Sequence, residues 1–224
     1  MTQRPDDDEV LDRAEKAAAD IRSSIISGAF TPGSRLSEQA LGDVLGVSRN
    51  TLREAFRMLT HEGLLLRRPH AGVMVAVPSL ASIIDIYRVR RMIEGQALRT
   101  APPRHPAGRA LAAAVDDALA ARDAGDWAAV GTANMEFHRA IVSLADSARL
   151  DRVYANVSAE LRLAFGLIDD PEYLHAPYVD RNVGVLRAHE EGRPADAADE
   201  LDAYLIQSER TVLAAYARRD RSVS

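Results

Sequence analysis

The segment "VSRNTLREAFRMLTHEG", residues 47–63, constrains the fold more than any other part of the chain. Ser48 is a residue type favoured at the N-cap, immediately before the first residue of a helix. Gly63 is a residue type favoured just after the last residue of a helix. Between them, apolar residues recur at the spacing of one helix face, namely Leu52, Ala55, Phe56 and Leu59. Arginines recur every fourth residue on the other side, namely Arg49, Arg53 and Arg57. The segment therefore predicts an amphipathic helix with a cationic outer face.

Two further helices are predicted before this one. Residues 11–27 have the apolar spacing of a helix. Residues 38–45 form a shorter helical segment, with Ser37 as a credible N-cap and Gly46 as the residue that ends it. The tight turn between this segment and the arginine helix is typical of a helix-turn-helix.

A hairpin is predicted directly after the arginine helix. The runs "LLLRR" (64–68) and "GVMVAV" (72–77) have the character of two strands, and the turn between them ends at Gly72. Three helices followed by a hairpin are the order of a winged helix-turn-helix. We therefore expect this domain over residues 10–78, preceded by a disordered acidic tail at residues 1–9.

The rest of the chain predicts a second, all-α domain. Residues 79–218 have helical spacing almost throughout, with interruptions that leave about six helices and no convincing strand. Residues 219–224 are expected to form a disordered tail. The predicted fold class is mainly α, with an N-terminal winged helix-turn-helix followed by a helical bundle.

Composition narrows the possible function classes. The chain has no cysteine, so disulfides and thiolate metal sites are excluded, which fits a reducing cytoplasm. The acidic N-terminus does not predict a signal peptide, and no apolar run approaches the roughly 18 residues that span a membrane. The formal net charge of −5 argues against a protein that coats nucleic acid regardless of sequence. We therefore expect a cytoplasmic protein whose basic surface is local.

The outer face of the arginine helix predicts contact with DNA. The major groove admits a helix, and arginine and asparagine can each bond to two atoms of a guanine or adenine edge. In the hairpin, Arg67, Arg68 and His70 are placed to reach phosphates or the adjacent minor groove. For three arginines alone, a solvated face is an equal alternative. The preceding helix, the tight turn and the basic hairpin favour DNA binding.

The string "IISGAFTPGSRLSEQALGDVLGVSRNTLREAFRMLTHEGLLLRRPHAGVMVA" resembles the DNA-binding domain of the GntR superfamily of bacterial transcription regulators, over about residues 11–77. The resemblance implies that two arginines of the third helix contact double-stranded operator DNA, helped by the polar residues between them and by a wing glycine. Where the second helix of the family usually carries an arginine, this chain has Gln39. The candidate DNA-binding residues are therefore Arg49, Asn50, Thr51, Arg53, Gln39, Ser48, Arg67, Arg68, His70 and Gly72.

The helical remainder, residues 80–217, resembles the sensor domain of the FadR-type branch, known as the FCD group. The resemblance is carried by "IYRVRRMIEGQAL", with Arg90 and Glu94 four residues apart, and by "NMEFHRAIVSLADS". It implies a homodimer with a small effector bound inside the helical bundle. A two-fold protein in turn implies a palindromic operator.

The FCD resemblance also implies a metal site that this sequence alters. The group often binds a divalent metal through an aspartate, a histidine four residues later and two histidines on later helices. The matching positions here hold Asn134, His138, Asn182 and Tyr204. One imidazole beside neutral amides and a phenol is too weak a set for a zinc-type ion. We therefore expect no metal and no other cofactor, with His189 as the residue that could restore a site.

These four residues, with Arg90, predict an effector-binding pocket. Polar groups that face into an alanine- and leucine-rich bundle need partners, because an unpaired buried group costs about 1–3 kcal/mol. A small organic ligand would supply them, and Arg90 could pair with a carboxylate. The alternative is that the polar groups bond to one another or to water.

The leading interpretation is an effector-controlled transcription regulator that is not an enzyme. The family resemblance implies a repressor, because most members of the family repress. The alternative is a helical-bundle enzyme, metal-dependent or metal-free, with an accessory winged-helix domain. Its candidates are His138 with Asp146, or the run "DDPE" at 169–172, although no serine or cysteine nucleophile and no glycine-rich phosphate loop accompany them. A winged helix used only for protein contacts would show an apolar or acidic outer face.

Overall fold

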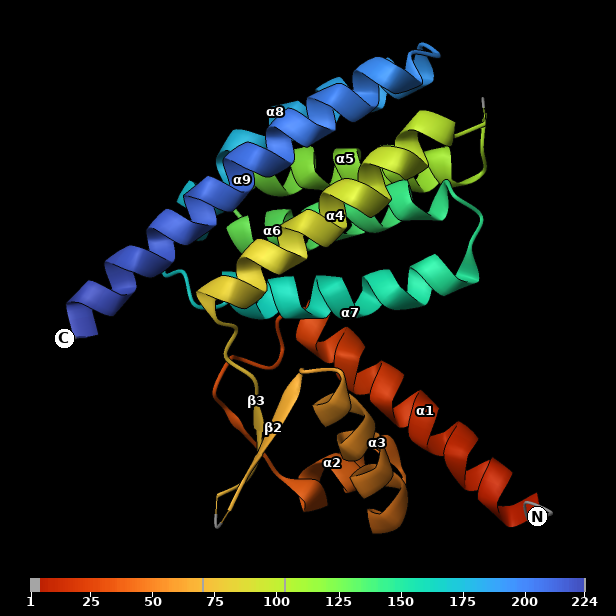
Figure 1. The fold of residues 1–224 in the computed structure, drawn as a ribbon, viewed down its shortest axis with the longest axis vertical. Coiled ribbons are helices and arrows are strands. Elements are labelled where there is room, and N and C mark those ends of the chain that lie inside the picture. Colours follow the sequence, from red (N-terminus) through yellow and green to blue (C-terminus); the bar gives the residue numbers. More distant parts are fainter. Residues whose placement is uncertain (1–4, 70, 103, 224) are drawn as a thin grey trace. The chain divides into compact units, whose positions relative to one another are not determined.

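In a computed structural model, residues 5–69, 71–102 and 104–223 are described, and the chain divides into two compact units (Figure 1). The N-terminal unit spans Met1–Val77, and the helical unit spans Pro78–Ser224. The predicted class, mainly α with an N-terminal winged helix-turn-helix and an all-α second domain, is confirmed. Within the described residues, no helix combines the length and the apolar character that crossing a membrane requires.

The described part of the N-terminal unit holds three helices and a small antiparallel sheet. Its elements are α1 (Pro5–Ile26), β1 (Arg35–Leu36), α2 (Glu38–Leu45), α3 (Arg49–His61), β2 (Leu65–Arg68) and β3 (Gly72–Val75). The strands lie in the order β1-β3-β2. In the β2–β3 hairpin, called the wing below, Arg67 pairs with Val73 and Arg68 with Gly72. The register therefore places two arginines next to the turn of the wing.

The apolar face of α3 packs on α1. The side chains that form this core are small or aliphatic apart from one phenylalanine, and they are Ala14, Ala17, Ala18, Ile21 and Ile25 from α1 and Leu52, Ala55, Phe56 and Leu59 from α3. Full burial of each larger side chain stabilises the fold by about 1.5–3 kcal/mol. Arg22 on α1 fixes the far end of α3, because its guanidinium donates to both carboxylate oxygens of Glu62 at 2.6–3.2 Å. The outer face of α3 is thus presented on a rigid support.

Three details of the fold differ from the sequence predictions. α1 begins at Pro5, where the sequence predicted a tail over 1–9 and a helix from Leu11. Proline is favoured at the first position of a helix, because its missing N–H needs no partner there. At the other end, α9 continues to Val223, through most of the tail predicted at 219–224. The two-residue strand β1 was not predicted, because it exists only through pairing with a strand that is distant in the sequence.

The described part of the helical unit consists of six helices. They are α4 (Leu80–Thr100), α5 (Ala107–Asp123), α6 (Trp127–Ser143), α7 (Ala148–Phe165), α8 (Pro171–Glu190) and α9 (Pro194–Val223). α6 is central, because it packs against α4, α5, α7 and α8. Gly131 on α6 permits a close approach, since Nε2 of His175 lies 2.6 Å from the position that a Cβ atom would occupy. Side chains on the inner faces of α6 therefore meet those of several helices.

Candidate DNA interface and buried polar cluster

The first turn of α3 is fixed by its cap. The Ser48 hydroxyl accepts a hydrogen bond from the backbone N–H of Thr51 at 3.2 Å and lies 2.8 Å from the Thr51 hydroxyl. Thr51 is only 4% exposed, because it precedes Ala55 by one helical turn and shares its buried face. The sequence predicted that Thr51 contacts DNA, whereas in the structure Thr51 is buried and is part of the helix cap. Ser48, also predicted to bind DNA, supplies the capping hydroxyl.

The other predicted residues of α3 lie on its exposed face. Arg49, Asn50 and Arg53 are exposed in the first half of the helix, where the helix dipole adds positive potential. Arg53 donates from Nε to Oε2 of Glu38 on α2 at 3.1 Å, and its side chain remains 59% exposed. This face can therefore approach a polyanion with its guanidinium groups foremost.

The wing extends the basic face of α3 on one side. A surface hollow of about 610 Å³ lies between the helix and the wing, and its polar lining includes Asn50, Arg53, Arg57 and Arg67. Arg68 is also exposed, but consecutive strand residues point to opposite faces, so it lies on the other side of the hairpin. His70, also predicted to bind DNA, falls outside the described residues. The structure thus brings Arg67 to α3 and separates Arg68 from it.

The turn of the wing places a further arginine at this surface. Gly72 has a φ of +85°, and the guanidinium Nε of Arg35 lies 3.5 Å from the position that a Cβ atom of Gly72 would occupy. Arg35 is exposed and was not among the predicted residues. No local pattern reveals it, because its place depends on the pairing of β1 with β3. Gln39, predicted on the second helix, is exposed on α2.

In the helical unit, the four residues predicted to replace a metal site meet. The Tyr204 hydroxyl on α9 lies 2.8 Å from Nε2 of His138 and 2.9 Å from Oδ1 of Asn134, so its one hydrogen is shared between two neighbouring acceptors. Asn182 on α8 donates from Nδ2 to the same Asn134 oxygen at 2.8 Å. None of the four is more than 8% exposed. Three helices are therefore joined through side chains that bond to one another.

A carboxylate that the sequence predictions did not assign to the site, Glu94 on α4, connects Arg90 to this group. Its Oε1 accepts from Nε of Arg90 at 2.8 Å and from the hydroxyl of Tyr154 at 2.6 Å. Its Oε2 lies 2.7 Å from Nδ1 of His138. The residues joined in this way are called the buried polar cluster below, and they are Arg90, Glu94, Asn134, His138, Tyr154, Asn182 and Tyr204.

The cluster contains one buried ion pair among neutral groups. Burial alone would raise the pKa of Glu94, but Arg90, His138 and the hydrogen bonds outweigh burial and lower it to about 2. Burial lowers the pKa of His138, with Arg90 acting in the same direction and Glu94 against it. Burial also raises the pKa of Tyr204 far above the ordinary value of a phenol, so its hydroxyl keeps its hydrogen.

Two atoms of the cluster lack a hydrogen-bond partner within the part of the chain that the structure describes. Nη2 of Arg90 is a buried donor, and Oδ1 of Asn182 is a buried acceptor. An unpaired buried group of this kind costs about 1–3 kcal/mol. The guanidinium carbon of Arg90 lies 5.2 Å from the ring centre of Tyr87, and this cation–π contact offsets part of the cost. The cluster therefore contains one buried donor and one buried acceptor whose hydrogen-bonding capacity is unused.

The same residues do not fit the divalent metal that the FCD resemblance implies. Across the described ranges, no three histidine, aspartate or glutamate side chains form a group that could hold a metal ion. Both carboxylate oxygens of Glu94 and both ring nitrogens of His138 already lie within hydrogen-bond distance of protein groups. Arg90 is a cation, and the other side chains offer neutral amides and protonated phenols, which are poor ligands for a zinc-type ion.

The catalytic groups considered for an enzyme have other partners. Asp146 lies 3.0 Å from Nε2 of His105, and the carboxylate beside His138 is Glu94. In the "DDPE" run, Asp170 caps α8 by accepting a hydrogen bond from the backbone N–H of Tyr173 at 2.9 Å. The pairing of His138 with Asp146 considered from the sequence is therefore wrong, and Asp170 has a structural role.

An exposed basic helix, supported by a second helix and flanked by a basic hairpin, defines the N-terminal unit as a winged-helix DNA-binding domain. Comparisons with known proteins agree with this class. The family described as "Bacterial regulatory proteins, gntR family" matches residues 13–75, and the family described as "FCD domain" matches residues 85–207. The protein belongs to the GntR family of bacterial regulatory proteins and carries an FCD domain, so the resemblance seen in the sequence is confirmed.

Individual relatives are transcription regulators. The Nta operon transcriptional regulator of Aminobacter aminovorans is 31% identical over 62% of this chain and 67% of its own length. A protein of Paenarthrobacter nicotinovorans, named for repression of a D-xylose utilization operon, is 28% identical over 70% of this chain and 72% of its own. A solved GntR regulator from Rhodococcus sp. RHA1 is 37% identical, with a TM-score of 0.82 over 92% of this chain and 99% of its own.

Proposed function

We propose that this protein is a cytoplasmic transcription repressor that binds a palindromic operator as a homodimer and is controlled by a small organic effector. On this proposal, α3 and the wing read the operator, and the buried polar cluster receives the effector. The protein acts by binding and catalyses no reaction.

Operator reading is supported by the exposed groups of α3. Arg49, Asn50 and Arg53 can each bond to base edges in a major groove, and Arg67 adds a cation on the wing side of the same hollow. The net charge of −5 is unfavourable for binding DNA without regard to sequence. A local basic face on an acidic protein is thus suited to a few specific sites.

The observation that carries effector control is the pair of unsatisfied atoms in the buried polar cluster. A ligand that offers an acceptor to Nη2 of Arg90 and a donor to Oδ1 of Asn182 would remove both unfavourable terms. A small carboxylate that also bears a hydroxyl or amino group has both features. The ionised partner of Arg90, Glu94, already balances its charge, so a neutral carbonyl acceptor also fits.

The cluster is also placed where a ligand would affect several helices at once. Its residues come from α4, α6, α7, α8 and α9, and each bond joins two of these helices except the Arg90–Glu94 pair. A ligand that inserts into this network has to displace or lengthen some of these bonds. Differential binding of this kind is what shifts a population between two arrangements of a protein.

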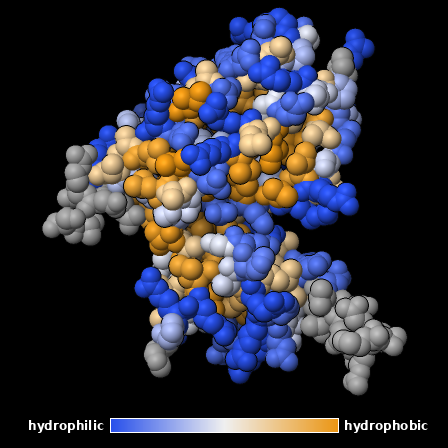
Figure 2. Space-filling view, in the orientation of Figure 1, coloured by the Kyte–Doolittle hydropathy of each residue, from blue (hydrophilic) through white to orange (hydrophobic). Residues whose placement is uncertain are grey.

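A homodimer is supported by symmetry and by surface composition. A palindromic operator matches a two-fold protein, and the helical unit leaves apolar side chains such as Met92 on α4 and Val153 on α7 exposed, where a second subunit would cover them. Figure 2 shows apolar residues among polar ones at the surface of the helical unit. Repression is supported by the name of the Paenarthrobacter relative.

DNA selection with the purified, full-length protein tests the proposal. We expect one enriched sequence with two inverted half-sites, present near few genes of the source genome, and light scattering should give a dimer with or without it. Organic acids and sugars related to the products of those genes should then be tested for release of the operator. A monomer, or selection that enriches no sequence, would refute the proposal.

A further inference from the structure

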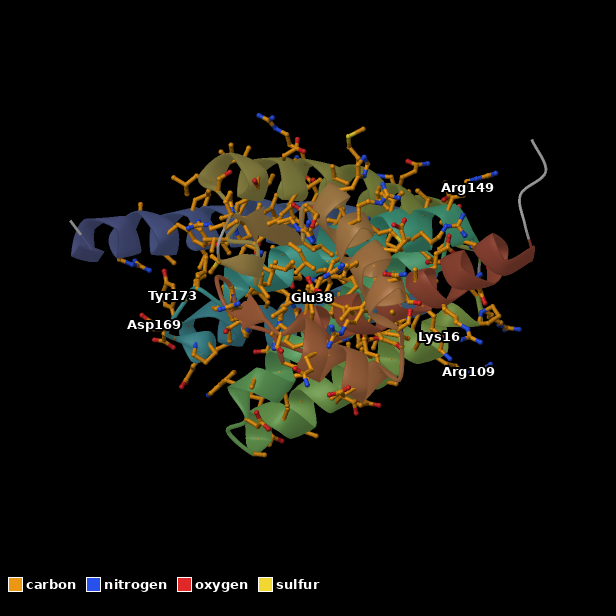
Figure 3. The ribbon with its side chains drawn as sticks, turned by 90° about the horizontal axis from the view of Figure 1, so that it is seen from below. Lys16, Glu38, Arg109, Arg149, Asp169 and Tyr173 are labelled. Carbon is orange, nitrogen blue, oxygen red and sulfur yellow. The ribbon has the colours of Figure 1, made fainter. Side chains whose placement is uncertain are left out.

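Glu38 is an acid that lies among groups assigned to DNA in the proposed function. It is the first residue of α2, and its Oε2 accepts the hydrogen bond from Nε of Arg53 on α3. With Arg35 and Gly72 it lines a surface hollow of about 480 Å³ beside the wing, and Figure 3 labels its side chain. Arg53 lines the neighbouring hollow with Asn50. A carboxylate thus lies next to the basic groups that would meet DNA.

Protein stability gives little reason for this contact. The side chains of Arg53 and Glu38 are 59% and 33% exposed, and an ion pair so exposed adds little to the free energy of folding. An acid in the first turn of a helix is favoured by the helix dipole, but that benefit does not require a contact with α3. Beside DNA, the same carboxylate would repel phosphates. The repulsion between Glu38 and DNA phosphates is therefore not offset by the small contribution of the Arg53–Glu38 ion pair to the free energy of folding.

We propose that Glu38 is a positioning residue that makes Arg53 selective for a base and disfavours its contact with phosphate. This inference rests on the DNA binding proposed above. The bond uses Nε of Arg53, so the two terminal amino groups keep the parallel arrangement that matches O6 and N7 of guanine. A guanidinium already held by Glu38 also loses less conformational freedom when it binds.

The charge of Glu38 acts in the same direction as its geometry. A carboxylate beside Arg53 weakens the attraction of that arginine for phosphates, and phosphate contacts carry no sequence information. Binding to unrelated DNA is therefore reduced, while binding to a correctly placed guanine keeps its two hydrogen bonds. The expected result is a larger ratio between operator affinity and affinity for unrelated DNA.

The test compares affinities of the full-length protein for its selected operator and for a scrambled duplex, over a series of salt concentrations. Glu38→Gln removes the charge and keeps a weaker acceptor, whereas Glu38→Ala removes both. We expect the affinity ratio to fall about tenfold in Glu38→Ala, as for a loosened arginine–guanine contact, and less in Glu38→Gln. Affinity for the scrambled duplex should rise, with a salt slope steeper by about 0.9, equivalent to one more phosphate contact.

Two controls separate this role from a general effect of charge or of folding. Asp43→Asn removes one negative charge from the exposed surface of the same helix, about 140° around its axis from Glu38, and should leave the ratio unchanged. In an Arg53→Ala background, the Glu38 substitutions should no longer change the ratio, because Glu38 acts through Arg53. The melting temperature of each variant should be measured to check that it is folded. If Glu38→Ala is not folded, the affinity ratio of Glu38→Gln alone tests the proposal.

The outcomes distinguish this inference from the proposed function. A wild-type protein that prefers no sequence would refute the proposed function and the role of Glu38 with it. A selective wild type with an unchanged ratio in the Glu38 variants would refute the role of Glu38 alone. That role is also refuted if Asp43→Asn causes an equal loss, or if the loss persists without Arg53.

Discussion

Nδ1 of His138 lies 2.7 Å from Oε2 of Glu94, and this contact joins α6 to α4 inside the helical unit. Because Glu94 is ionised and a carboxylate can only accept, this ring nitrogen carries a hydrogen. The other carboxylate oxygen holds Arg90 and Tyr154. One acid thus balances a buried guanidinium and fixes the orientation of an imidazole and a phenol.

Glu94→Gln should lower the free energy of unfolding by about 3–5 kcal/mol, because it leaves Arg90 buried without a counter-charge. Urea unfolding followed by circular dichroism measures the change. Glu136→Gln is a matched control, since Glu136 pairs with Arg139 on the exposed side of α6 and such a pair contributes at most about 1 kcal/mol. Equal and small losses in the two variants would mean that the Arg90 guanidinium does not depend on Glu94.

Lowering the pH should reduce the free energy of unfolding, because His175 takes up a proton more readily in the unfolded chain than in the folded one. Burial, together with the charge of Arg162, lowers the pKa of His175 to about 4 from its ordinary value of 6.5. The unfolded chain takes up this proton near pH 6.5, whereas the folded chain does so only near pH 4. The stabilisation is therefore fully present above pH 6.5 and is lost as the pH falls through this window. The loss should be on the order of 3 kcal/mol.

The variant His175→Gln tests this assignment by unfolding in urea at a series of pH values. Its free energy of unfolding should fall less than that of the wild type between about pH 6.5 and pH 4, because it lacks the proton uptake of His175. His138 and Glu94 titrate in both proteins, so their contribution cancels in the comparison. His61→Gln, at the exposed end of α3, should follow the wild type. Parallel curves for His175→Gln and the wild type would contradict the assignment.

The sequence predicted those parts of the site that depend on helical spacing. Asn134 and His138 are one turn apart on one helix, and their meeting with Asn182 and Tyr204 was inferred from the family resemblance. The burial of Thr51 could also have been predicted from the sequence. Thr51 lies one turn before Ala55 and two turns before Leu59, and both of these residues were predicted to face the core.

Other parts of the site depend on packing between distant elements and had no local signature. Tyr154 reaches Glu94 only because α7 packs against α4, and nothing in the segment around it distinguishes it from a core tyrosine. Arg35 lies beside the wing only because a two-residue strand pairs with β3. The bond from Arg53 to Glu38 likewise joins two helices whose relative placement no periodicity determines.

Substitutions in α3 and the wing should separate base reading from phosphate contact. Arg49→Ala and Arg53→Ala should each weaken operator binding by about 1–3 kcal/mol and relax the preference for one base. Arg67→Ala should weaken binding to operator and scrambled duplex alike and reduce the salt slope by about 0.9. Arg149, exposed on α7 and labelled in Figure 3, provides an arginine-to-alanine control outside the N-terminal unit. Wild-type affinity in both α3 variants would remove α3 from the reading surface.

The helical unit should keep its fold without a metal ion. Zinc sites need about four strong ligands, or three with a water molecule. Of the four positions that the FCD resemblance assigns to a metal, His138 alone retains a strong ligand, and both of its ring nitrogens lie within hydrogen-bond distance of protein groups. His189 could be recruited only by a rearrangement, because it lies two turns beyond Asn182, and its Nε2 is 3.7 Å from the position of a Cβ atom on Gly108 of α5.

Elemental analysis of the purified, untagged protein should therefore find well under one metal ion per chain, and EDTA should leave the melting temperature unchanged. The triple variant Asn134→Asp, Asn182→His and Tyr204→His is the matched comparison, because it would place three strong ligands beside His138, on helices that already bring these positions within hydrogen-bond reach. It should gain a zinc-dependent rise in melting temperature that EDTA reverses. Stoichiometric metal in the wild type, lost together with stability in EDTA, would mean that ligands outside the buried polar cluster bind it.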